Sequence, residues 1–114
     1  MLNLDFCKKL NDFLGIVPAS ISSFYRTVER NQAVGGSSNS AHLHGVAADL
    51  ILDTGVNIES AIWHAKDLKF HGIEYDSRNR HLHLDDHPSG RIWHVIIKPD
   101  GMQLSIDRWK SEQV

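Results

Sequence analysis

The chain has 114 residues, of which 41% are hydrophobic and 23% are charged, a composition typical of a single globular domain in water. Its formal net charge of −2 argues against nucleic acid as the main partner, because binding to phosphates needs a basic surface. No stretch approaches the roughly 20 apolar residues of a membrane span. Because charged residues interrupt the first ten positions, we expect no signal peptide, a protein that is cytoplasmic as synthesised, and one domain over residues 1–114.

The N-terminal part of the chain predicts one helix and one short strand. Apolar residues at spacings of three and four predict a helix that is capped by Asn3 or Asp5 and runs to about Phe13. Gly15 is expected to end this helix. The run at residues 21–25 predicts a short strand.

The middle of the chain predicts two helices with a strand between them. A short helix is expected over residues 28–33, and the Gly/Ser-rich residues 35–40 then predict a loop. The mostly apolar run at residues 47–52 predicts a strand. Inward-facing apolar residues at helical spacing predict a longer helix over residues 57–68.

Strands dominate the last third of the predicted structure. Residues 81–85 alternate between polar and apolar side chains and predict a strand. Residues 92–98 predict a second strand, which we expect to pair with the first as a hairpin, and residues 102–106 predict a last short strand. Because helices come early and strands late, we expect an α+β fold with a mainly antiparallel sheet flanked by helices.

One carboxylate lies within an apolar stretch. Asp49 has apolar neighbours on both sides in the predicted strand at residues 47–52. A buried, unpaired carboxylate costs several kcal/mol, so it needs a metal ion or a buried arginine as a partner. The alternative is an aspartate at a strand end that faces the solvent.

Histidines accompany Asp49 in the pattern. The chain has eight histidines, and histidine is the commonest metal ligand. His42 lies shortly before Asp49, and alternation places His81, His83 and Asp85 on one face of their predicted strand. That face is either part of a metal-binding cleft or an ordinary strand surface in contact with water. Two histidines and one carboxylate, with water as the fourth ligand, form a catalytic zinc arrangement.

The motifs also resemble those of a known family. The segment Ser-Ala-His-Leu-His-Gly-Val-Ala-Ala-Asp at residues 40–49 resembles the Ser-x-His-x-x-Gly-x-Ala-x-Asp motif of zinc D-alanyl-D-alanine carboxypeptidases and L-alanyl-D-glutamate endopeptidases. Residues 81–83 resemble the family's His-x-His motif, and residues 21–26 are similar to its strand that ends in an arginine. Asn31 together with residues 34–38 further resembles small, often phage-encoded members. The resemblance implies the fold that these peptidases share with the hedgehog signalling domain.

The resemblance implies a role for each matched residue. The zinc ligands would be His42, Asp49 and His83. Arg26 would hold the substrate carbonyl and stabilise its developing negative charge, although a surface salt bridge with Glu29 is the alternative. Ser40 would support the metal loop on the substrate side by hydrogen bonding. His81 would line the cleft and assist the transition state.

One position departs from the family pattern. Family peptidases carry an acidic general base shortly before the third zinc ligand, often three residues before it, and Arg80 stands there in this chain. Asp76 is our first candidate for the base, with the alternative that it only shapes a turn. Glu74 is the second candidate. A zinc site without such a base would bind its ligand but hydrolyse slowly.

The resemblance therefore predicts a zinc-dependent hydrolase that cuts an amide bond in peptidoglycan stem peptides. We expect a monomer with no nucleic-acid or membrane partner. Such an enzyme would act on the cell wall if a phage-type route released it. The sequence leaves open whether it is a carboxypeptidase or an endopeptidase, because loops set specificity in such folds.

Two other functions remain open at this point. The first is a non-catalytic zinc-binding module of the same fold, which Arg80 favours. The second is a protein that buffers metals or senses pH through surface histidines, a function that leaves Asp49 unexplained.

Overall fold

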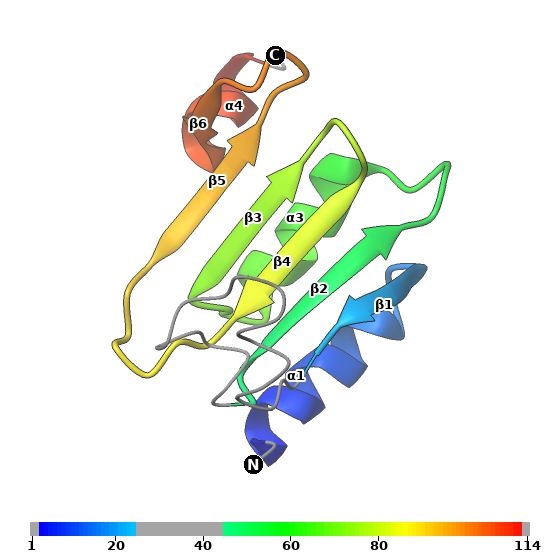
Figure 1. The fold of residues 1–114 in the computed structure, drawn as a ribbon, viewed down its shortest axis with the longest axis vertical. Coiled ribbons are helices and arrows are strands. Elements are labelled where there is room, and N and C mark those ends of the chain that lie inside the picture. Colours follow the sequence, from blue (N-terminus) through cyan, green and yellow to red (C-terminus); the bar gives the residue numbers. More distant parts are fainter. Residues whose placement is uncertain (1–2, 25–44, 113–114) are drawn as a thin grey trace, which may run out of the picture.

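The computed structural model describes residues 3–24 and 45–112 and is built on one six-stranded sheet (Figure 1). The strands lie in the order β1-β2-β4-β3-β5-β6. Their bounds are β1 Ala19–Ser23, β2 Ala47–Leu52, β3 Gly72–Asp76, β4 His81–Asp85, β5 Trp93–Ile97 and β6 Gln103–Ser105. The described helices are α1 Leu4–Leu14, α3 Ile58–Asp67 and α4 Ile106–Glu112.

The two longer helices that the sequence predicted are both present. Asn3 caps α1, because its side-chain oxygen accepts a hydrogen bond of 2.9 Å from the backbone N–H of Phe6, and Asn57 caps α3 in the same way. Gly15 is the C-cap of α1, as expected. The helix predicted over residues 28–33 lies outside the described residues. None of the described helices is long and apolar enough to cross a membrane.

The strands agree with the predicted α+β class, although the sheet is mixed. All neighbouring strands are antiparallel except β3 and β5, which run parallel. β2 and β4 have the predicted bounds, while β1 covers Ala19–Ser23 instead of residues 21–25. The strand expected at residues 102–106 is shorter, because Ile106 already begins α4, a helix that the sequence interpretation missed.

The predicted hairpin between residues 81–85 and 92–98 is wrong. β4 pairs with β2 on one edge and with β3 on the other, so neither edge is left for β5. The sequence pattern did not predict β3, which begins at Gly72, shortly after the end of α3. Since β3 takes the place beside β4, the connection at residues 86–92 crosses to the far edge of β3, where β5 adds in parallel.

The core fixes which face of the sheet carries the polar residues. Phe6 and Phe13 of α1 and Leu82 and Leu84 of β4 are at most 1% exposed and belong to one apolar cluster. The helices α1 and α3 lie behind the sheet in Figure 1 and cover this apolar face. Because side chains alternate along a strand, His83 projects from the opposite face. A slip of one residue would bury the polar set, so core packing also fixes the register of the site.

Candidate metal centre

The central strands place Asp49, His83 and Glu74 side by side. β4 lies between β2 and β3, and the register pairs His83 with Asp49 on one side and with Glu74 on the other. Directly paired residues of neighbouring strands point to the same face of a sheet. The next row along β4 holds His81 beside Asp76 in the same way. One face of three strands therefore gathers imidazoles and carboxylates.

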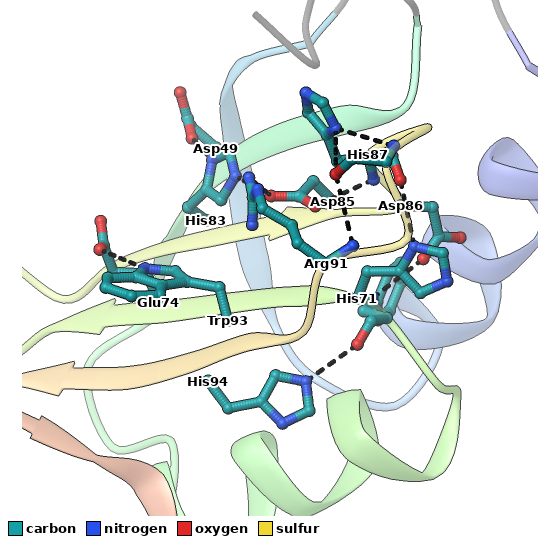
Figure 2. Close-up of polar contacts among 12 residues, drawn as sticks. Asp49, His71, Glu74, His83, Asp85, Asp86, His87, Arg91, Trp93 and His94 are labelled. Atoms are coloured by element: carbon teal, nitrogen blue, oxygen red, sulfur yellow. Dashed lines mark hydrogen bonds and ion pairs between the residues drawn. The ribbon is translucent and has the colours of Figure 1, made fainter.

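The imidazole of His83 lies between two carboxylates (Figure 2). Its Nδ1 atom is 2.8 Å from Oδ1 of Asp49, and its Nε2 atom is 2.7 Å from Oδ2 of Asp85. The side chains of His83 and Asp49 are 22% and 14% exposed, whereas that of Asp85 is fully buried. Contacts at both ring nitrogens hold the imidazole in one orientation.

The two carboxylates favour a positively charged imidazole. Burial by itself lowers the pKa of His83, but the hydrogen bonds and negative charges of Asp49 and Asp85 outweigh burial and raise the pKa to about 9. Burial likewise raises the pKa of Asp85, but the hydrogen bond and charge of His83, the backbone N–H of His87 and the charge of Arg91 bring it down to about 2. The metal-free protein therefore has a charged His83 at neutral pH.

Stability of the metal-free protein should fall as the pH rises through about 9. Because folding raises the pKa of His83 above its ordinary value of 6.5, the stabilising contribution is complete below about 6.5 and is lost as the pH passes about 9. Thermal unfolding of chelator-treated protein should show a lower midpoint at about pH 10 than at about pH 6. His83→Gln should remove this difference, and identical pH profiles for both proteins would contradict the assignment.

The two candidate bases differ in their surroundings. Asp76 accepts hydrogen bonds from Nε and Nη2 of Arg78, at 2.9 and 2.8 Å, and from the backbone N–H of Arg78 at 3.0 Å. The side-chain hydrogen bond from Arg78 is the main cause that lowers the pKa of Asp76. Glu74 lies directly opposite His83 and accepts a hydrogen bond of 3.2 Å from Nε1 of Trp93 (Figure 2). Asp76 thus shapes the turn, whereas Glu74 stands beside the predicted metal ligand.

Arg80 occupies a turn between β3 and β4. Its backbone has a φ of 57°, in the left-handed region, and its Nε donates a hydrogen bond of 3.1 Å to the carbonyl oxygen of Leu52. The next residue, His81, places its Nε2 atom 3.9 Å from Oδ1 of Asp49. The arginine therefore ties the hairpin to the end of β2, and the histidine stands at the margin of the Asp49–His83 pair.

The structure brings two of the three predicted zinc ligands together. Asp49 and His83 offer a carboxylate and an imidazole, which are donors that zinc takes in proteins. His42, Arg26 and Ser40 lie outside the described residues. Within residues 3–24 and 45–112, no group of three or more His, Cys, Asp or Glu side chains is arranged to hold a metal ion. The pair fits a zinc site to which the predicted ligand His42 would add the third protein donor.

Three side chains of this region were not assigned a role from the sequence. Alternation placed Asp85 on the polar face of β4, but its contact with His83 follows from burial that the pattern does not reveal. Arg91, which lies before β5, reaches Asp85 of β4. Trp93 reaches Glu74 across the unexpected β3–β5 pairing. Apart from the alternation that includes Asp85, no sequence signal links these residues to the site.

Comparison with known proteins supports this fold. Residues 1–85 match the family model described as Peptidase M15, a match that spans α1 to β4 and includes Asp49, Glu74 and His83. The chain belongs to the peptidase M15 family, as the motifs at residues 40–49 and 81–83 suggested. It is also 33% identical over 86 residues to the zinc D-Ala-D-Ala carboxypeptidase of Streptomyces albus G. That alignment covers 70% of this chain and 32% of the relative, so the chain spans about a third of the relative's length.

Proposed function

We propose that this protein is a zinc-dependent hydrolase that cleaves an amide bond in peptidoglycan stem peptides. The observation that carries the proposal is the pair of Asp49 and His83, which lie on central strands beside Glu74. Oδ1 of Asp49 and Nδ1 of His83, two atoms that can bind a metal ion, are 2.8 Å apart. Family membership and the name of the Streptomyces relative support it. The ligand set of the proposal is His42, Asp49 and His83.

In the proposed reaction, the zinc ion activates water and side chains of the protein bind and orient the substrate. A zinc ion bound by this ligand set supplies a Lewis acid that activates water and polarises a carbonyl group. Arg26 holds the carbonyl oxygen of the substrate and stabilises the negative charge that develops on it. His81 lines the cleft next to Asp49, and Ser40 supports the loop that carries His42.

We assign the general base to Glu74 and keep Asp76 as the alternative. The guanidinium of Arg78 binds Asp76 through two nitrogens and lowers its pKa, which makes this carboxylate a weaker base. Glu74 lies beside His83 in the register, on the face that carries Asp49. The hydrogen bond from Trp93 orients the Glu74 carboxylate.

The proposal is tested by incubating zinc-loaded protein with purified muropeptides and analysing the products by mass spectrometry. Release of D-alanine identifies a carboxypeptidase, whereas cleavage between L-alanine and D-glutamate identifies an endopeptidase. The matched control is the same protein stripped of metal by a chelator and then reloaded with zinc, which should lose and regain activity. Intact substrate in the presence of fully zinc-occupied protein would contradict the proposal.

A non-catalytic zinc module of the same fold is the second candidate. It is favoured by Arg80, whose guanidinium binds the carbonyl oxygen of Leu52 at the position where relatives of this kind carry an acid. The module would bind muropeptides in a zinc-dependent manner without cutting them. Titration calorimetry on the same substrate, followed by mass spectrometry of the recovered ligand, separates the two candidates.

The remaining expectations concern partners and location. We propose a monomer whose partner is the peptide of peptidoglycan, with no nucleic-acid or membrane partner. Among the described residues, several exposed large apolar side chains lie on different elements, such as Leu4 on α1, Trp63 on α3 and Met102 before β6, which supports a monomer. The motif resemblance to small phage-encoded members supports release to the cell wall by a phage-type route.

A further inference from the structure

One carboxylate of the polar face has no place among the proposed zinc ligands. Asp85 is 0% exposed, and it is the one buried charged side chain in the part of the chain that the structure describes. A carboxylate is costly to bury unless donors replace its water. The register places it between Ala47 of β2 and Gly72 of β3, within the central strands.

Three donors hold this carboxylate in place. Its Oδ2 atom lies 2.7 Å from Nε2 of His83 and accepts a hydrogen bond of 3.0 Å from Nη2 of Arg91. Its Oδ1 atom accepts a hydrogen bond of 3.1 Å from the backbone N–H of His87. Figure 2 shows Asp85 enclosed by these groups on the side of His83 that faces away from Asp49.

The neighbouring strand makes room for the same carboxylate. Gly72 is paired with Asp85 across β3 and β4, and a Cβ atom at Gly72 would overlap with both carboxylate oxygens of Asp85. Gly72 is the first residue of β3, and a glycine in a strand often marks a place where another group approaches closely. The lack of a side chain at Gly72 therefore leaves room for the Asp85 carboxylate beside the His83 imidazole.

We propose that Asp85 is a positioning residue that accepts a hydrogen bond from Nε2–H of His83 and thereby presents Nδ1 to the metal. The inference rests on the proposed zinc site. Nδ1 faces Asp49, the other proposed ligand on the described strands, whereas Nε2 faces Asp85. A carboxylate at the second nitrogen of a metal-bound histidine fixes the tautomer and the ring orientation.

The surroundings of Asp85 argue against Asp85 itself as a metal ligand. The guanidinium of Arg91 lies 3.0 Å from Oδ2 and would repel a cation bound there. The other oxygen, Oδ1, accepts the backbone N–H of His87. Asp49, at the opposite nitrogen of the His83 ring, is 14% exposed, whereas Asp85 is fully buried. A metal ion is therefore expected at Nδ1.

Nitrogen NMR of zinc-loaded protein tests the inference directly. With ¹⁵N-labelled histidine, the His83 ring should show a protonated Nε2 and a metal-bound Nδ1. This measurement needs no variant, so a folding defect cannot obscure it. A metal-bound Nε2 in His83 would overturn the proposal.

A charge-removing variant provides the second test. Asn at position 85 has one acceptor oxygen for donors on both sides, so Asp85→Asn should lower zinc affinity by about 10–100-fold in a competition titration with a chromophoric chelator. The matched control is Asp86→Asn, because Asp86 binds Lys9 and the backbone N–H of His71 instead of His83. Asp86→Asn is expected to leave zinc affinity and the His83 signals unchanged. Equal zinc affinities for Asp85→Asn and wild type would overturn the proposal.

These outcomes separate this inference from the proposed function. Zinc bound through Nδ1 of His83 without any peptide cleavage would contradict the hydrolase and support the role of Asp85. Peptide cleavage with zinc bound through Nε2 of His83 would support the hydrolase and contradict the role of Asp85. A wild-type protein that takes up no zinc would overturn both.

Discussion

Glu74→Gln should lower kcat for muropeptide cleavage by about 10²–10⁴-fold while zinc content remains that of the wild type. Glutamine keeps the shape of Glu74 and can still accept the hydrogen bond from Trp93, but its amide cannot take a proton from water. Steady-state kinetics together with metal analysis of the same preparation measure both quantities. Loss of activity with retained zinc would identify Glu74 as the base.

Asp76→Asn is the matched control for that variant. It removes one charge from the same strand and from the neighbouring row, where Asp76 pairs with His81. Because Arg78 already engages this carboxylate, we expect a small effect on kcat and a modest loss of stability. A large loss of kcat in Asp76→Asn with little change in Glu74→Gln would move the base to Asp76.

His83→Ala should remove zinc binding and, with it, all measurable activity. Loss of a direct ligand should reduce zinc affinity well beyond the roughly 10–100-fold expected when an outer partner of a ligand is lost. Zinc raises the unfolding temperature of any protein whose folded state alone binds it, so the zinc-induced rise should vanish in this variant. Thermal melts with and without zinc provide the measurement.

His81→Ala is the natural comparison, because it removes the same side chain two residues away on the same face of β4. The Nε2 atom of His81 is 3.9 Å from Asp49, so we expect zinc to remain bound while catalysis suffers. An exchange of the two results, with zinc lost from His81→Ala and kept by His83→Ala, would assign the third ligand to His81.

The fold was predictable where local pattern decides the structure. The apolar run at residues 47–52 and the alternation at residues 81–85 gave the bounds of β2 and β4, and Asn3 and Asn57 marked two helix starts. The pairing of strands was not predictable from local sequence, because it depends on which strand edges the other strands leave free. The short β3 was overlooked, and the partner assigned to residues 92–98 was wrong for that reason.

The part of the candidate site that the sequence predicted is the part that depends on residue type and strand pattern. A carboxylate in an apolar strand and a histidine on an alternating strand pointed to Asp49 and His83, which the register then placed side by side. Which side chains contact Asp49 and His83 depends also on how deeply each neighbouring residue is buried, as Asp85 shows. Whether Asp85 is buried or exposed cannot be read from alternation, because both faces of a central strand can be covered.

Because Gly72 and Asp85 approach each other closely, the residue that is tolerated at one position depends on the residue at the other. Ordinarily each of two facing residues fills its own space, but here one carboxylate occupies the space of both. Effects of substitution at residues in contact do not add. Gly72→Ala should therefore be harmful only while Asp85 is present, and relatives with a small residue at position 85 should accept a side chain at position 72. A side chain at position 72 therefore has to be introduced together with a smaller residue at position 85.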